Sequence, residues 1–213
     1  MKSGFNFDKF FWILAAILFV EWAALAIDVH SRTTWVLENL LVAMFVAPVA
    51  WAYGRGHLSR TSLILIFIFT MIHNIGAHYT YSLVPYERWL HIDFGERNHF
   101  DRWVHFLFGV LLFRPLRDVL RKLSGLNARW APIVAVLTVI AFSTVYELIE
   151  FAAAMAMGDD TGGEYVGTQG DPWDAQKDQA LALWGALLGW LIDNRLSSRR
   201  GGWAIGPLRF HWS

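Results

Sequence analysis

The clearest membrane-spanning segment of the chain is Trp130–Met157, WAPIVAVLTVIAFSTVYELIEFAAAMAM. A helix needs about 20 predominantly apolar residues to cross the hydrocarbon core of a bilayer, and this segment exceeds that length. Its only charged residues are Glu147 and Glu150, which are three positions apart and therefore share one face of a helix. The segment predicts a transmembrane helix that carries two carboxylates.

The composition extends this interpretation to the whole chain. Hydrophobic residues make up 55% of the 213 residues, charged residues make up 17%, and the mean hydropathy is +0.36. These values predict an all-α, polytopic membrane helix bundle, with residues 1–213 as a single integral membrane domain. About six transmembrane helices are expected, at Phe10–Ile27, Leu37–Tyr53, Thr61–Leu83, His99–Phe113, Trp130–Met157 and Lys177–Ile192. The first is interpreted as a retained helix, because no convincing signal-peptide cleavage site follows it.

The distribution of charge predicts the orientation in the membrane, since basic residues collect on the cytoplasmic side. The two termini, together with the loops that begin near Arg55 and Arg114, hold 13 of the 18 Lys and Arg residues. The alternate loops hold 12 of the 18 acidic residues, a set in which we include Glu38. We therefore expect both termini in the cytoplasm and an acidic outer face.

This orientation gathers acids and histidines on the outer side of the bilayer. Each ionisable group in an apolar segment costs roughly 2.5 to 3.5 kcal/mol on insertion scales, so a cluster needs a partner or an ion. We expect one deep cavity, with Arg97 and Arg102 at its rim in position to hold an anionic substrate group. The expected lining residues are His73, His78, Asp101, His105, Glu147, Glu150, Asp171, Asp174 and Asp178.

The spacing of these residues favours a divalent cation. Asp101 and His105 are four positions apart and share a helix face, as do Glu147 and Glu150. Neighbouring carboxylates in a low-dielectric medium repel each other unless one is protonated or a cation lies between them. The chain has no cysteine, so metal ligands must be His, Asp or Glu. Zinc is the first expectation, with manganese or magnesium as alternatives.

The expected roles divide the cluster into ligands and a base. Asp101, His105, Glu147 and Asp178 are the predicted metal ligands, and Glu150 or His73 is the predicted general base. The ion would activate water or polarise a phosphoryl or carbonyl oxygen.

Each group also has a purely structural interpretation. Asp101 resembles a helix-capping or first-turn acid, and His73 resembles a hydrogen-bonded residue between helices. Glu150 could pair with Arg97 or Arg102. The convergence of several such groups, rather than any one of them, favours a site.

Two sets of glycines have different expected roles. Gly185 and Gly189 form a small-xxx-small pair that predicts close packing of the last helix against a neighbour. The glycine-rich segment from Met157 to Lys177 predicts tight turns and a lid over the cavity.

Glu21, within the first apolar helix, remains without an assigned role.

Four runs of residues resemble the bacterial inner-membrane family of unknown function typified by YjdF. The resemblance implies a small multi-pass protein of the bacterial inner (cytoplasmic) membrane, and it implies no particular activity. It covers most of the chain. The runs are HNIGAHYTYS at 73–82, RNHFDRWVHF at 97–106, YELIE at 146–150 and GTQGDPWDAQKD at 167–178.

A weaker resemblance extends to VanZ-like membrane proteins, which pair Asp-Lys-x-x-His with a later Glu-x-x-Gln. Here Arg102 stands in place of the Lys, Glu150 in place of the Gln, and Ala182 in place of a later Asn. That group is linked to envelope and glycopeptide phenotypes.

Three classes of function remain open. The first is a metal-dependent hydrolase or transferase acting on a lipid-linked or envelope substrate. The second is a transporter of metal, protons or a small solute, and the third is a non-catalytic structural membrane protein. A cavity on one side favours the enzyme, because the inner ends of the helices show no comparable acids. The bilayer is the expected partner and nucleic acid is not, while the oligomeric state stays open.

Overall fold

The computed structural model describes residues 5–157 and 168–199, and within these ranges the chain forms helices without strands. Its long helices correspond to the six predicted segments, so the all-α bundle is confirmed. The helices are α1 (Lys9–Leu25), α2 (Arg32–Gly54), α3 (Arg60–His78), α4 (Tyr86–Leu90), α5 (Phe100–Leu123), α6 (Trp130–Met157) and α8 (Asp174–Arg199).

The first three helices begin at residues that satisfy the free backbone N–H groups of a helix start. The side chains of Asp8, Ser31 and Ser59 accept hydrogen bonds from backbone N–H groups three residues further on. α5 runs on to Leu123, well past the predicted end at Phe113, although Pro115 lies within it.

α3 ends at His78, not at the predicted Leu83. The backbone of Thr80 and Tyr81 adopts positive φ angles of 55° and 56°. Such angles cost non-glycine residues of order 1 to 3 kcal/mol each. The N–H of Tyr81 donates a 2.8 Å hydrogen bond to the Gly76 carbonyl, and the phenol ring lies against Gly76. The turn therefore folds Tyr81 back into the bundle, where it is buried.

α5 is the central helix of the bundle, since it packs against α3, α6 and α8. α5 and α8 touch backbone to backbone. A Cβ atom added at Gly109 would lie 2.2 Å from the Ala182 carbonyl oxygen, and one added at Gly185 would lie 2.1 Å from the Phe106 carbonyl oxygen. A Cβ at Gly189 would meet the Val110 carbonyl oxygen at 2.7 Å. The predicted close packing of the Gly185–Gly189 face is confirmed, with α5 as the partner.

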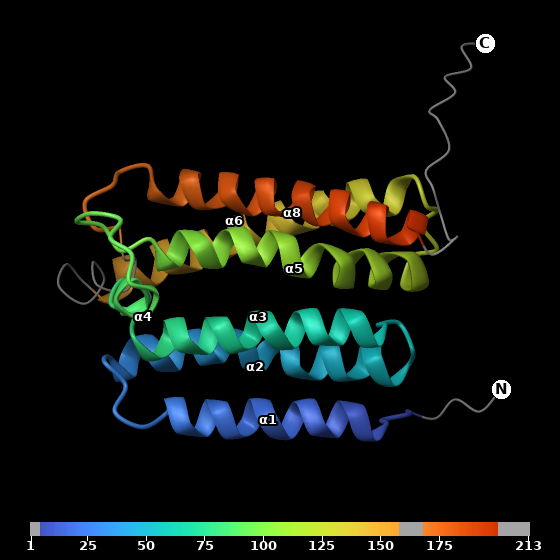
Figure 1. Cartoon of the computed structure of the whole chain (residues 1–213), viewed down its shortest axis with the longest axis horizontal. Helices are drawn as coiled ribbons and strands as arrows, with labels where there is room; N and C mark the ends of the chain where they lie inside the picture. Colours follow the sequence, from blue (N-terminus) through green and yellow to red (C-terminus); the bar gives the residue numbers. More distant parts are fainter. Residues whose placement is uncertain (1–4, 158–167, 200–213) are drawn as a thin grey trace, which may run out of the picture.

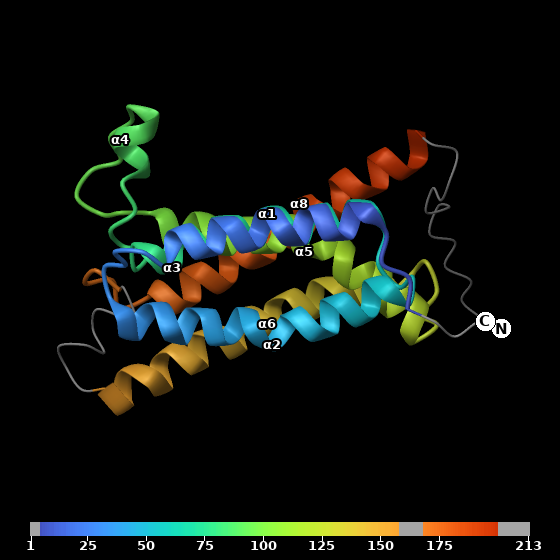
Figure 2. The same cartoon turned by 90° about the horizontal axis from the view of Figure 1, so that it is seen from below.

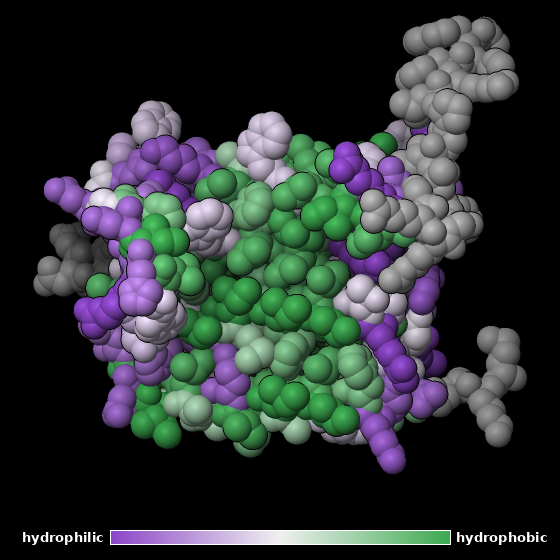
Figure 3. Space-filling view, in the orientation of Figure 1, coloured by the Kyte–Doolittle hydropathy of each residue, from purple (hydrophilic) through white to green (hydrophobic). Residues whose placement is uncertain are grey.

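The surface of the bundle matches a membrane environment. Figure 3 shows a continuous hydrophobic band across the middle of one face, with hydrophilic residues at the two ends. Among the described residues, α2, α3 and α6 are long and apolar enough to be clear membrane spans. α1 has only 17 residues, and α5 and α8 carry charged residues within their lengths. The protein is thus a membrane helix bundle, and six spans remain a prediction.

The chain alternates between the two ends of the bundle. α1 begins and α8 ends at the same end, which we call the terminal end (Figures 1 and 2). The opposite end carries α4 and the first turns of α2, α5 and α8, and we call it the pocket end. This arrangement is the one expected if both termini share one side of the membrane.

An apolar layer separates the two ends in the interior. Phe113 of α5, Val139 of α6 and the alanines Ala182 and Ala186 of α8 are completely buried in a single cluster. This cluster fills the space between α5, α6 and α8 with apolar side chains.

Beyond this layer, at the terminal end, lies a network of ion pairs. Asp193 pairs with Arg114, at 3.3 Å, and with Arg117. Arg117 also pairs with Asp118 at 2.8 Å, and the hydroxyl of Ser62 donates to Asp118 at 2.6 Å. The expectation that the inner helix ends carry no comparable acids is wrong. The acids are present, but arginines on the same side neutralise them.

We predict that the pocket end faces outward. A membrane-impermeant maleimide should label a cysteine at Glu96, in the exposed loop before α5, in intact cells. A cysteine at Ser124, exposed in the loop after α5, should react only after permeabilisation. The chain has no cysteine of its own, so each variant reports a single site. The reverse labelling pattern would contradict the predicted orientation.

Candidate functional site

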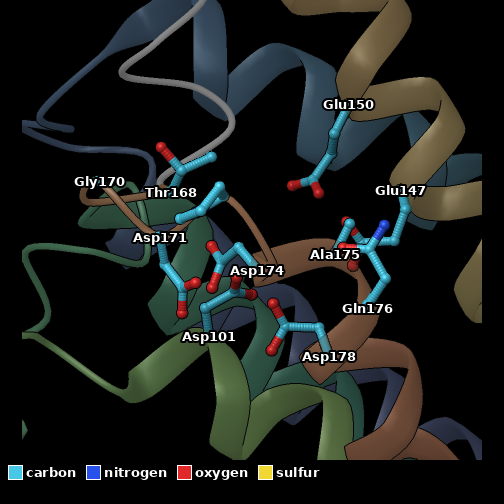
Figure 4. Close-up of a pocket in the computed structure, with 11 residues that line it drawn as sticks. Asp101, Glu147, Glu150, Thr168, Gly170, Asp171, Asp174, Ala175, Gln176 and Asp178 are labelled. Carbon is cyan, nitrogen blue, oxygen red and sulfur yellow. The ribbon is translucent and has the colours of Figure 1, made fainter.

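A cavity of about 320 Å³ opens at the pocket end. It is lined by six carboxylates, which come from α5, α6, the start of α8 and the segment just before α8, and which converge in Figure 4. The lining residues are Asp101, Glu147, Glu150, Thr168, Gly170, Asp171, Pro172, Asp174, Ala175, Gln176 and Asp178. The predicted gathering of these acids around one cavity agrees with the geometry.

The centre of the site is a histidine surrounded by carboxylates. Asp101, His105 and Asp178 each offer one ligand atom, and these atoms lie within 4.8 Å of one another. The Nε2 atom of His105 lies 3.7 Å from Asp101 Oδ1 and 3.3 Å from Glu147 Oε1. Its Nδ1 atom lies 3.3 Å from the hydroxyl of Ser143, which helps to fix the ring orientation. The imidazole therefore presents Nε2 to the acids.

Asp178 is the most informative member of this group. Its side chain opens the second turn of α8 and is only 1% exposed. Its Oδ1 atom has no hydrogen-bond partner among the described residues, and neither has Oε1 of Glu147. A buried charged oxygen without a partner is strongly unfavourable unless a proton or a cation compensates it. Both oxygens belong to residues that line the cavity.

The rim is held together by ion pairs. Arg97 pairs with Asp174, and one of its N–H groups donates a 2.5 Å hydrogen bond to the Thr168 carbonyl. Arg102 donates to Asp171 at 2.5 Å and to Asp174 at 3.3 Å. Neither arginine lines the cavity. Their guanidinium groups tie the start of α8 to α5 and its preceding loop. The contact with an anionic substrate group stays a prediction.

The ion pairs of the rim explain the acidity of Asp171. Hydrogen bonds from Lys177, from the backbone N–H of Trp173 and from Arg102 stabilise its ionised form and lower its pKa to about 2. Because the pKa is lower in the folded state, Asp171 stabilises the protein above its ordinary pKa, and this stabilisation disappears as the pH falls through the folded value.

We predict that Asp171→Asn lowers the melting temperature by the same amount at about pH 7 and about pH 5. The difference from the original protein should shrink only below about pH 4, where the unfolded carboxyl begins to protonate. Thermal melts of the two proteins across this range provide the measurement. A difference that already vanishes near pH 6 would contradict the ion-pair assignment. Exposed Glu96→Gln serves as the control, with no expected shift.

A second polar cluster lies deeper in the bundle and includes an acid whose role the sequence did not indicate. Glu38 was counted among the acids of the outer loops, although it falls within the predicted helix Leu37–Tyr53. It lies inside α2 and is 1% exposed. The hydroxyl of Tyr146 lies 3.0 and 3.1 Å from its two oxygens, and Nε2 of His73 lies 3.8 Å away. The available signal was that Val36 and Leu37 precede Glu38 and apolar residues resume at Leu40, which places the acid within a helix rather than before one.

The two predicted cavity histidines of α3 lie elsewhere. His73 is buried in the deeper cluster and does not line the cavity. Nδ1 of His78 lies 2.8 Å from the Leu25 carbonyl oxygen, so this ring fastens the end of α3 to the end of α1. Glu21, unassigned from sequence, accepts a 2.7 Å hydrogen bond from Asn74.

Glu150 is buried and lines the cavity beside Glu147. No pairing with Arg97 or Arg102 is found, since both arginines are engaged with aspartates within the described ranges. The predicted glycine-rich lid lies mostly outside the described residues, at 158–167.

Fold and site together define a polytopic membrane protein with a pocket of carboxylates and one histidine at one end of its helix bundle. The chain belongs to the family described as "Predicted membrane protein (DUF2238)", whose model matches residues 10–199. Inner membrane protein YjdF of Escherichia coli (strain K12) is 36% identical to it over 168 residues, which cover 76% of this chain and 78% of that protein. No solved structure matches the chain. The matches confirm the family resemblance and support an inner-membrane location.

Proposed function

We propose that the protein is a metal-dependent hydrolase or transferase that acts on a lipid-linked substrate at the outer face of the membrane. The observation that carries this proposal is the buried Asp178 carboxylate, which has an oxygen without a partner beside His105 and Asp101. A divalent cation would satisfy that oxygen and offset the repulsion among the surrounding acids.

The donor set suits zinc. Zinc accepts one imidazole nitrogen and carboxylate oxygens at about 2.0 to 2.2 Å, and a catalytic site keeps one position open for water. Asp101, His105 and Asp178 would supply three protein ligands, with Glu147 beside them. Their ligand atoms, within 4.8 Å of one another, need only small side-chain adjustments to surround one ion. Manganese or magnesium would require more oxygen ligands or water molecules.

Glu150 is placed to act as the general base. It lines the same cavity, one helical turn from Glu147, and it has no arginine partner among the described residues. A cation held there would make water a stronger acid and polarise a phosphoryl or carbonyl oxygen. Glu150 would accept one proton from the attacking water and return it to the leaving oxygen as the bond to that oxygen breaks.

The apolar layer supports an enzyme over a carrier. A carrier needs access to its site from both sides of the membrane, whereas the fully buried apolar side chains of Phe113 and Val139 pack between α5, α6 and α8. The acids at the terminal end are paired with arginines and lie beyond that layer. Exposed apolar side chains on α6, such as Leu148 and Phe151, flank the cavity acids and would let a lipid tail remain in the bilayer.

The test is hydrolysis by the purified, reconstituted protein. A panel of polyprenyl phosphates, polyprenyl pyrophosphates and lipid esters would be supplied with zinc and, separately, with a chelator. We expect zinc-dependent turnover of at least one class and a loss of about 100-fold or more in Glu150→Gln, within the range for a general base. Glu87→Gln, on α4 and outside the cavity lining, is the matched control. Turnover that persists in the chelator or in Glu150→Gln would refute the proposal.

A further inference from the structure

An acid lies inside the first apolar helix, outside the cavity lining. Glu21 is half-buried in α1, about one turn before the helix ends at Leu25. It is the only charged residue of α1 apart from Lys9 at the start, and the exposed side chains of Ile17 and Val20 near it are apolar. An ionisable group in such a segment is costly and needs a partner.

The partner of this carboxyl is Asn74 of α3, which is 3% exposed. The side-chain N–H of Asn74 donates a 2.7 Å hydrogen bond to Oε2 of Glu21. The other oxygens of the two groups, Oε1 of Glu21 and Oδ1 of Asn74, are both buried and have no hydrogen-bond partner among the described residues. Both atoms are acceptors as long as the carboxyl is ionised, so neither can satisfy the other.

One proton on Oε1 would satisfy both oxygens. A protonated carboxyl has one O–H donor, and a primary amide carries an acceptor and a donor on the same carbon. The two groups can therefore join through two hydrogen bonds in a closed ring, and the first of these bonds is already present. A metal cation fits less well, because calcium and magnesium need about six or more oxygen ligands.

The charged and titratable groups of the neighbouring elements have other contacts. In α3, Nδ1 of His78 lies against a carbonyl at the end of α1, and His73 belongs to the deeper cluster with Glu38 of α2. Arg32 of α2 donates to the backbone just after α1. The lysine and arginine ion pairs in the described ranges are with aspartates at the two ends of the bundle. The loop from α1 to α2 adds Asp28 and His30.

We propose that Glu21 and Asn74 form a proton-binding site within the membrane, and that the bound proton fastens α1 to α3. When the proton leaves, the carboxylate keeps one hydrogen bond and its second oxygen carries charge in an apolar environment, which weakens the contact between the two helices. The docking of α1 therefore responds to pH. The site shares no residue with the cavity, so it stands or falls independently of the proposed function.

The first experiment exchanges the carboxyl for an amide. A glutamine side chain has the donor and acceptor of a protonated glutamate, so Glu21→Gln keeps both hydrogen bonds at every pH. A folded state that holds the carboxyl protonated binds more protons than the unfolded state, so its stability falls as the pH rises above about 4.3. We expect the melting temperature of the original protein to fall relative to Glu21→Gln by about 3 to 5 °C per pH unit, until the folded carboxyl ionises.

The control for these melts is Glu96→Gln, an exposed acid whose substitution should give a curve parallel to that of the original protein. Parallel curves for the original protein and Glu21→Gln between about pH 5 and about pH 8 would overturn the proposal. A Glu21→Gln protein that does not fold would also overturn it, because this variant preserves both proposed hydrogen bonds.

Infrared spectroscopy detects the proton directly. At about pH 7 the original protein should show the carbonyl band of a protonated carboxyl that is absent in Glu21→Gln. The bands of the other acids are common to both proteins and cancel in the difference spectrum. The same band should shift in folded Asn74→Leu, which removes the amide partner. A difference spectrum that shows only the loss of an ionised carboxylate in Glu21→Gln would refute the proton site.

Discussion

Replacing Asp178 with Asn is expected to weaken zinc binding by about 100-fold or more. Loss of a residue that only supports a ligand typically costs 10- to 100-fold in metal affinity, and loss of a direct ligand costs at least the upper end of that range. The substitution keeps the size of the side chain and removes the charge of the carboxylate, which is 1% exposed. Isothermal titration of the purified protein with zinc measures the effect.

Asp193→Asn is the matched control for this prediction. Asp193 also lies on α8 and is also buried, but it pairs with Arg114 and Arg117 at the terminal end. The control should leave zinc affinity unchanged even if it lowers the melting temperature. If Asp178→Asn binds zinc as the original protein does and melts at the same or a higher temperature, the carboxylate is not a ligand and the cluster has a structural role.

The second large effect is expected at Gly185. A Cβ at this position would lie 2.1 Å from the Phe106 carbonyl oxygen, far inside the normal contact distance, and neither backbone can move alone. Overpacking of a core typically costs 1 to 3 kcal/mol, and backbone collisions cost more because whole helices must separate. We expect Gly185→Ala to lower the melting temperature markedly and Gly185→Leu to prevent recovery of a folded, monodisperse protein from membranes.

Ala180→Leu provides the comparison for Gly185→Leu. Ala180 lies on the same helix but is exposed, so the added side chain meets no neighbouring backbone. Size-exclusion chromatography in detergent and a thermal melt distinguish the two variants. A Gly185→Leu protein that elutes and melts like Ala180→Leu would show that α5 and α8 do not meet through their glycines.

Much of the fold follows from hydrophobic length alone, but the helix ends do not. The segments predicted around Trp130 and Thr61 match α6 and the body of α3 closely. α5 and α8 are longer than predicted. Their charged end turns are helical but not hydrophobic, so a prediction from hydropathy misses them. The early end of α3 depends on the left-handed backbone of Thr80 and Tyr81. The sequence does not predict this left-handed conformation, because neither Thr80 nor Tyr81 is a glycine.

The grouping of acids around His105 was largely predictable, and the deeper cluster was not. Helical spacing places Asp101 beside His105. Because successive helices run in opposite directions, both residues lie at the same end of the bundle as Glu147 and Asp178. Glu38 was counted with the loop acids although the predicted helix already began at Leu37, and the sequence does not show that Tyr146 and His73 meet it. The ion pairs of Arg97 and Arg102 with aspartates were not predicted, because the sequence does not show which acid each cation meets.

The glycine contact between α5 and α8 has a consequence for how the site can move. With no side chains between their backbones, these two helices cannot slide or tilt against each other without a collision, so they behave as one rigid unit. That unit carries Asp101, His105 and Asp178 together. Glu147 and Glu150 belong to α6, whose apolar contacts with the unit tolerate small displacements more easily. Three of the candidate ligands therefore keep a fixed geometry relative to one another. A small movement of α6 toward or away from this unit would add its carboxylates to the candidate ligand set or remove them from it.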